Sequence, residues 1–201
     1  MPVEIRLIVV DTAPLITLAA ANSLDYLFYP DLHVVIPDAV FHEAAAGASK
    51  LGAQVIIDWY RTNRGKVTIE PTEAFDAEQL LSEQAGYRPT RDLGERAAIE
   101  IVRHGHFLDG PDDRAILLSD DRDVQKLLVI DPERIILLTT WDFLRQLEEA
   151  QRIQSADAVI DLVRAAGRNP VQRDLWSGHE PDIRDAVRAI LDKSRKDGPK
   201  Q

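Results

Sequence analysis

Short apolar runs alternate with amphipathic stretches along most of the chain. Runs of branched aliphatic residues between polar or turn-forming residues predict strands, here residues 5–10, 33–36, 66–69, 114–119 and 135–138. Apolar positions spaced three and four residues apart predict helices, here residues 15–21, 39–46, 51–62, 73–84, 92–104, 120–128, 141–150, 155–166 and 182–194. This alternation is typical of an α/β fold with a mostly parallel sheet. The nearly all-apolar run IRLIVV predicts a first strand that is covered on both faces.

Local residues predict where two of these helices begin and end. Thr12 is a candidate N-cap just before Pro14, because a hydroxyl can accept a hydrogen bond from the first turn, where proline is tolerated. Asp38 is a candidate cap for the next helix, and Gly47 is its candidate end.

The regular alternation of predicted strands and helices ends at Gly167. Residues 1–167 carry the regular alternation, and we expect them to form one domain. Residues 168–201 begin with turn-forming Asn-Pro, Ser-Gly and Glu-Pro pairs, continue with one predicted helix and end in the polar sequence RKDGPKQ. We therefore expect a C-terminal extension that contains one helix.

Composition narrows the class of protein. No apolar run approaches the ~18 residues of a membrane span, and we expect the N-terminus to be a strand rather than a signal peptide. The chain has no cysteine, which excludes disulfides, thiolate zinc sites and thiol nucleophiles and favours the cytoplasm. The 24 basic and 34 acidic residues give a net charge of −10. Nucleic-acid binding would therefore require a local basic patch or a bridging metal ion.

Acidic residues stand at several points where a predicted strand ends or a helix begins. Asp11 follows the first strand and can cap the helix after it, and Glu43 lies on the helix after the second strand. Glu95 comes three residues after an aspartate, which is the spacing of a capping box. Asp120 and Asp121 follow the apolar run AILLS, where they can cap the next helix. Each acid taken alone thus has a structural interpretation.

Taken together, the same acids predict a common chemical role. The loops at the carboxyl ends of parallel strands converge, so acids from these four segments can meet. Carboxylates that share one pocket repel one another, and some must take up a proton unless a cation is present. Mg²⁺ and Mn²⁺ prefer oxygen ligands and commonly bridge carboxylates to a substrate phosphate. The pattern therefore predicts a divalent metal ion at the ends of the strands.

Four segments resemble, in order and spacing, the acidic motifs of PIN-domain proteins of the toxin type (VapC-like), the ribonucleases of toxin–antitoxin pairs. The segments are VVDTAPLITLAAANSLDYL, VIPDAVFHEAAA, DLGERAAIEIV and ILLSDDRDVQKLL. In addition, TTWDFLRQLEEAQRI resembles the closing strand and helix of one branch of this family. The resemblance implies a three-layer α/β/α fold with a mainly parallel central sheet. It also implies a metal-dependent endoribonuclease that uses Mg²⁺ or Mn²⁺.

The resemblance assigns metal-binding and catalytic roles by position. Asp11, Glu43 and Glu95 match the first three acids of the family. The fourth is Asp120 if the alignment is anchored on the paired acids, or Asp121 if it is anchored on the preceding serine, and we favour Asp121. The hydroxyl groups of two further residues would support the site through hydrogen bonds, namely Thr12 and Ser119.

Substrate and partners follow from the same resemblance. RNA would be hydrolysed at a phosphodiester by a water that the metal activates, and unpaired RNA exposes its phosphates most readily. A cognate antitoxin and a second copy of the chain are the expected protein partners.

His42, beside Glu43, is interpreted as a partly exposed helix residue. Four arginines close in sequence to the third and fourth acids are candidates for RNA binding or for ordinary surface ion pairs: Arg91, Arg96, Arg114 and Arg122.

Other functions compete with the nuclease. A non-catalytic PIN-like module that binds nucleic acid or protein predicts that the acids do not bind metal. An aspartyl phosphatase would require a second aspartate two residues after Asp11, where Ala13 stands. No G-x-G-x-x-G sequence follows the first strand and no G-x-x-x-x-G-K-[ST] sequence occurs, which argues against dinucleotide and P-loop sites.

Overall fold

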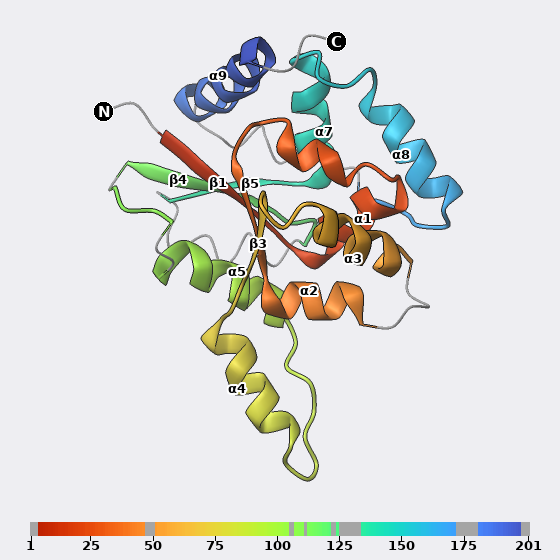
Figure 1. Cartoon of the computed structure of the whole chain (residues 1–201), viewed down its shortest axis with the longest axis vertical. Coiled ribbons are helices and arrows are strands. Elements are labelled where there is room, and N and C mark those ends of the chain that lie inside the picture. The colour runs from red at the N-terminus through yellow and green to blue at the C-terminus, as the bar shows by residue number, and fades with distance from the viewer. Residues whose placement is uncertain are drawn as a thin grey trace.

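Five parallel strands form one sheet in the described part of the chain, in the order β3-β2-β1-β4-β5 (Figure 1). The computed structural model describes residues 4–46, 51–104, 107–110, 112–121, 124, 134–171 and 181–197. The strands are β1 (Glu4–Val10), β2 (His33–Pro37), β3 (Val67–Glu70), β4 (Asp113–Leu118) and β5 (Ile135–Leu138). The predicted parallel sheet is confirmed, and the strand ends differ from the predicted ones by one residue at most.

Helices cover both faces of this sheet (Figure 1). Side chains alternate along a strand, so Ile8 and Val10 of β1 are buried against one helical layer, whereas Leu7 and Val9 are buried against the other. The first layer includes α1, α7 and α8, and the second includes α5. This arrangement confirms the three-layer α/β/α fold. The helices are α1 (Thr12–Ala20), the 3-10 helix η1 (Leu24–Phe28), α2 (Asp38–Ala45), α3 (Ala53–Thr62), α4 (Glu73–Ser82), α5 (Leu93–His104), α7 (Thr140–Glu149), α8 (Ala156–Ala165) and α9 (Pro181–Asp197).

Asp11 and Thr12 were both predicted as possible caps of the first helix, and the structure uses Asp11. Asp11 is the N-cap of α1, and its Oδ1 accepts a hydrogen bond of 2.7 Å from the Thr12 backbone N–H. The extended backbone of Asp11, with φ of −84° and ψ of 167°, turns its carboxylate toward the first turn. Thr12 already lies inside the helix, so the prediction that its hydroxyl is the cap is wrong. Asp38 also lies inside its helix, as the first residue of α2, whose N-cap is Pro37, so the prediction that Asp38 is the cap is wrong as well. Its carboxylate accepts a hydrogen bond from the Ala39 N–H.

Two expectations fall partly or wholly outside the described residues. Gly47, the expected end of the second helix, is one of them. The helix expected over residues 120–128 is described only at its first two positions and at Val124. Asp120 and Asp121 are not helical, whereas Val124 is. The helix therefore does not begin at Asp120 as predicted, because the carboxylate of that residue is bonded to the start of α7 instead.

The helix predicted in the C-terminal extension is present as α9, which contacts β1. Val187 and Leu191 of this helix are buried in the same core cluster as Ile8 and Val10 of β1. None of the described helices is both long enough and apolar enough to cross a membrane.

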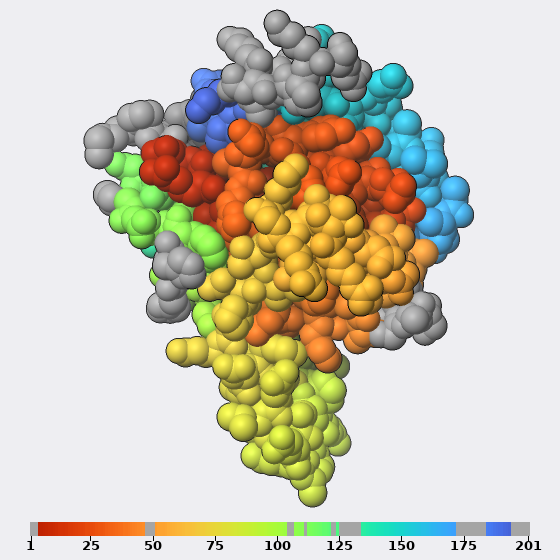
Figure 2. Space-filling view, viewed as in Figure 1, coloured from red at the N-terminus to blue at the C-terminus, as the bar shows by residue number. Residues whose placement is uncertain are grey.

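Helix α4 and the segment that follows it project from the body as an arm (Figures 1 and 2). The first turn of α4 is attached to α5 by Glu100, whose two carboxylate oxygens accept hydrogen bonds of 2.6 and 3.0 Å from the N–H groups of Glu73 and Ala74. The segment after α4 is joined to α4 itself by Glu78, which is 8% exposed and accepts a hydrogen bond from the Thr90 N–H. The arm is thus attached to α5 at its first turn, and its two parts are joined to each other by a buried carboxylate.

The direction in which successive strands are added to the sheet reverses between β1 and β4. The chain builds β1, β2 and β3 toward one edge and then crosses to place β4 on the opposite side of β1. The two strands end together, since Val10 is paired with Leu118. Such a reversal opens a crevice at the carboxyl ends of the strands, which is where open α/β sheets bind their ligands.

Candidate functional site

A cavity of about 380 Å³ lies at the carboxyl ends of β1 and β4. Its wall brings together acids from the ends of two strands and from two helices. These are all the acids singled out from the sequence, namely Asp11, Glu43, Glu95, Asp120 and Asp121. Thr12 also lines the cavity, as do residues 168–171 at the start of the C-terminal extension. Segments that are far apart in sequence therefore meet at this point.

Asp11 lies at the centre of the hydrogen bonding in this cavity. It is 4% exposed, and its Oδ2 accepts a hydrogen bond of 2.8 Å from the hydroxyl of the fully buried Ser119. Burial raises the pKa of the Asp11 carboxyl group to about 6, against the opposing effect of the hydrogen bonds from Ser119 and the Thr12 N–H. The negative charges of Glu43 and Asp120 raise this pKa further.

Glu95 occupies the first turn of α5 and faces the same cavity. Burial raises the pKa of its carboxyl group to about 7, and the charges of Asp11 and Asp121 act in the same direction. The capping-box interpretation of this residue is not supported, because Asp92 has a φ of 58°. An N-cap residue normally has an extended backbone.

Gly94 allows α5 to begin beside Asp11. A Cβ atom at this position would lie 3.2 Å from the Asp11 Oδ1 and 3.2 Å from the Val40 Cγ2, both tight contacts. The sequence analysis assigned Gly94 no role, although its position immediately before Glu95, in the first turn of a predicted helix, was a signal for one.

Glu43 is exposed on α2, but one of its carboxylate oxygens accepts a hydrogen bond from another residue of the cavity. The Thr12 hydroxyl donates a hydrogen bond of 2.9 Å to the Glu43 Oε2. Thr12 and Ser119 thus each place a hydroxyl against a carboxylate, as the resemblance implied.

Asp120 and Asp121 have different surroundings. The two carboxylate oxygens of Asp120 accept hydrogen bonds of 2.8 and 2.9 Å from the N–H and the hydroxyl of Thr140, the first residue of α7. The Asp121 N–H donates to the Ser119 hydroxyl oxygen, and the Asp121 charge acts on Glu95. Asp120 therefore bonds to α7 while its charge acts on Asp11, whereas the charge of Asp121 acts on Glu95.

Arg168 is a cationic residue of the site that sequence reasoning missed. Its Nε donates a hydrogen bond of 3.0 Å to the Thr17 Oγ1, and its Nη2 donates one of 3.2 Å to the Ala13 carbonyl oxygen, both on α1. Its charge lowers the pKa of Asp120, although burial raises that pKa overall. No local pattern could reveal this role, because Arg168 is separated from Thr17 by 151 positions.

The four arginines expected near the site have different positions. Arg91 is exposed and lines a neighbouring groove, whereas Arg96 is exposed and does not line the acidic cavity. Arg114 does not line the cavity: it pairs with Ile5 at the amino ends of the strands, opposite to the cavity, so closeness to the acids in sequence did not bring it to the site. Arg122 lies outside the described residues.

The donors around the cavity are carboxylate and hydroxyl oxygens, which suit Mg²⁺ or Mn²⁺. Among the described residues, no group of three or more acidic or histidine side chains is arranged closely enough to hold a metal ion directly. Mg²⁺ usually keeps several of its waters and contacts only one or two carboxylates. The open arrangement and the mutual repulsion of the acids therefore fit a hydrated divalent cation.

The fold and the cavity define a class, that of α/β/α proteins with several acids at the carboxyl ends of parallel strands. Residues 7–168 match the model of the PIN domain, so the chain belongs to the PIN-domain family. PIN domains are generally nucleases that use divalent metal ions, which places this chain in the nuclease superfamily. A search of curated proteins found no match.

Proposed function

We propose that this chain is a Mg²⁺- or Mn²⁺-dependent endoribonuclease and that it acts as the toxin of a type II toxin–antitoxin pair. The observation that carries the nuclease proposal is the convergence of Asp11, Glu43, Glu95 and Asp121 on one cavity at the switch point of the sheet. Burial raises the pKa values of the Asp11 and Glu95 carboxyl groups, and the negative charges of neighbouring carboxylates raise them further. A polyanionic substrate can approach such a site only with cationic help.

The same four acids would hold the divalent ion. When bound, the ion supplies Lewis-acid chemistry, since it lowers the pKa of water and neutralises charge that develops on a phosphodiester. Ser119 and the Thr12 N–H orient the Asp11 carboxylate, and the Thr12 hydroxyl orients that of Glu43. These hydrogen bonds reduce the rearrangement that the acids require before they bind a cation.

Arg168 would bind the substrate phosphate from the other side of the cavity. Its guanidinium is held against α1 by two hydrogen bonds, and the residue lines the cavity. A planar guanidinium can donate parallel hydrogen bonds to two phosphate oxygens. This residue therefore provides local positive charge on a chain whose net charge is −10.

Asp11→Asn tests the nuclease proposal. The substitution keeps the shape of the side chain but removes the charge that would bind the ion, so we expect loss of measurable Mn²⁺ binding by calorimetry. We also expect cleavage of an oligoribonucleotide to fall by at least about 100-fold. Asp157→Asn, at an exposed position on α8, is the matched control and should leave both quantities unchanged. Equal Mn²⁺ binding by wild type and Asp11→Asn would contradict the proposal.

The toxin role rests on the resemblance of the motif order and has its own test. Expression of the wild type in a bacterial host should arrest growth and produce discrete fragments of cellular RNA, whereas Asp11→Asn should do neither. The proposed homodimer and antitoxin complex can be sought by light scattering and by co-purification from the same cells. Active cleavage in vitro without growth arrest would remove the toxin role and leave the ribonuclease.

A non-catalytic PIN-like module is the second candidate, and two observations favour it. Asp11, Glu43 and Asp120 each accept hydrogen bonds from the protein, and no closed metal cage exists among the described residues. This candidate predicts that Mn²⁺ does not bind to the wild type at all.

A further inference from the structure

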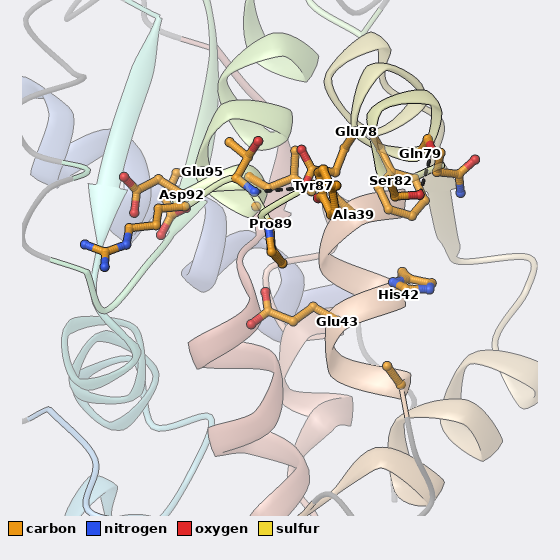
Figure 3. Close-up of a pocket in the computed structure, with 16 residues that line it drawn as sticks. Ala39, His42, Glu43, Glu78, Gln79, Ser82, Tyr87, Pro89, Asp92 and Glu95 are labelled. Atoms are coloured by element: carbon orange, nitrogen blue, oxygen red, sulfur yellow. Dashed lines mark hydrogen bonds between the residues drawn. The ribbon is translucent and has the colours of Figure 1, made fainter. Parts of the chain in front are cut away.

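A second and larger hollow adjoins the acidic cavity. This groove has a volume of about 840 Å³ and lies between α2, the α4 arm and the start of α5 (Figure 3). Its volume is in the range of pockets that bind small organic ligands. Glu43 and Glu95 line both hollows, so the groove opens directly beside the acids proposed to bind the metal.

Aromatic rings form part of the groove wall. His42 of α2 and Phe75 of α4 are in contact, with ring centroids 5.2 Å apart and planes inclined by 47°. Tyr87, half-buried on the segment after α4, lines the same groove. Figure 3 shows His42 and Glu43 leaving α2 in different directions, with Glu43 on the side of Asp92 and Glu95. The groove thus has an aromatic part next to an acidic end.

The charges on the wall determine which part of a nucleic acid this groove can accept. Glu78 and Asp92 line it in addition to the two shared glutamates, whereas Arg91 is its one permanently cationic residue within the described chain. Phosphate groups would be repelled along such a surface. A nucleobase is uncharged and planar, it can stack on aromatic rings, and its N–H groups can donate to carboxylates.

We propose that this groove is the subsite for one unpaired nucleobase next to the cleaved phosphodiester. The inference rests on the proposed ribonuclease function and adds the recognition that the acidic cavity lacks. The phosphodiester lies at the acids and Arg168, and the adjacent base turns into the groove and stacks on Tyr87 or Phe75. A base held in a duplex cannot reach this position without leaving its stack.

The test uses a short single-stranded oligoribonucleotide, Mn²⁺ and two groove variants. Tyr87→Ala removes a ring from the segment after α4, and Phe75→Leu removes a ring while keeping apolar bulk in the arm. Loss of one base–aromatic stack should raise KM by about 5- to 100-fold. The value of kcat should stay within about threefold, because the acids are untouched. Leu80→Ala is the matched control, since Leu80 lies on the same helix, is 69% exposed and is not part of the groove wall.

Substrates that lack a single base identify which nucleotide places its base in the groove. Oligonucleotides that lack one base at each position in turn should reveal a single position, next to the cleaved bond, whose loss raises KM for the wild type. At that position Tyr87→Ala or Phe75→Leu should cause little further loss, because both changes remove the same contact. Fully additive losses would overturn the proposal, and so would equal cleavage of a duplex of the same sequence.

The outcomes separate this inference from the function on which it rests. If the wild type cleaves RNA but KM is unchanged in both groove variants, the base subsite is wrong and the groove is left for a protein ligand. If the wild type shows no metal-dependent cleavage, the ribonuclease proposal fails and the subsite fails with it. Unchanged thermal unfolding and unchanged Mn²⁺ affinity in the variants are required for a rise in KM to count as support.

Discussion

Asp120 and Asp121 are neighbours in sequence, yet the fold surrounds their carboxylates differently. Asp120 is 8% exposed and bonds through both oxygens to Thr140. Asp121 is half-buried, and its charge raises the pKa of Glu95. At the scale of the residue, we therefore expect Asp120 to matter for stability and Asp121 for the metal.

Alanine at each position separates these two roles. Asp120→Ala leaves the buried N–H and hydroxyl of Thr140 without their acceptors, so the free energy of unfolding should fall by about 1–3 kcal/mol. Asp121→Ala should change stability by less than about 0.5 kcal/mol but weaken Mn²⁺ binding by at least about tenfold. Urea unfolding and calorimetry measure the two quantities. The opposite pattern would make Asp120 the fourth metal-binding acid.

Arg168 can be distinguished from the acids by the sign of its effect on the metal. Arg168→Gln removes a positive charge from the cavity, so Mn²⁺ affinity should stay the same or increase, whereas loss of an acid decreases it. The ratio kcat/KM for RNA should fall by about 10- to 100-fold, the loss expected for one charge-assisted hydrogen bond. Arg168→Lys should recover part of this loss, because it keeps the charge without the planar fork. Unchanged kcat/KM in both variants would leave Arg168 a purely structural role on α1.

At the scale of the element, the α4 arm depends on contacts made at its base. Glu100 of α5 accepts hydrogen bonds from the first two residues of α4, where N–H groups have no partner within their own helix. Thr72 caps the same helix, and Asp38 accepts hydrogen bonds from the N–H and the hydroxyl of Thr72. The groove wall is therefore held by side chains that belong to α2 and α5.

Glu100→Ala should loosen this arm without unfolding the body. Loss of two hydrogen bonds to a charged acceptor should speed hydrogen exchange of the α4 amides by about tenfold or more, while the amides of β1 and β4 keep their protection. Glu83→Ala, at the exposed C-cap of the same helix, is the control. Unchanged exchange in α4, or equal acceleration throughout the sheet, would contradict this account of the arm.

At the scale of the whole molecule, the buried acids make stability depend on pH. Asp11 and Glu95 have pKa values raised to about 6 and about 7 in the folded protein, from 3.8 and 4.5. Between about pH 4 and 7 the folded state therefore binds more protons than the unfolded state, and the free energy of unfolding must fall as pH rises through this window.

We expect the metal-free protein to be less stable at pH 8 than at pH 5 by on the order of 2 kcal/mol, after allowance for the partial exposure of Glu95. Urea unfolding in the presence of a chelator measures the difference. The double variant Asp11→Asn/Glu95→Gln isolates the contribution of the site and should show a much weaker pH dependence. Mn²⁺ should restore stability at pH 8 in the wild type only. A wild type that is more stable at pH 8 would contradict the raised pKa values.

The strands and most helices could be predicted because burial patterns are local. Side chains of β1 alternate between two apolar layers, and a run of consecutive apolar residues is the signature of that environment. Nearness in sequence was a poor guide to nearness in the site. Arg114 is close in sequence to Asp120 but lies at the other end of β4, since an extended strand separates residues by about 3.3 Å each. Thr12 was mistaken for a cap because the pattern does not show which residue begins the helix.

The sequence by itself determined the layered α/β architecture, the ends of the strands and the acids that stand there, because each depends on interactions between near neighbours. Only the tertiary structure decided which groups meet. The Ser119 hydroxyl contacts Asp11 across 108 positions, Arg168 contacts α1 across 151, and the groove between α2, the α4 arm and α5 lies beside the acidic cavity. Such contacts form when the whole chain buries its apolar faces, and no local pattern predicts them because the partners lie far apart in sequence.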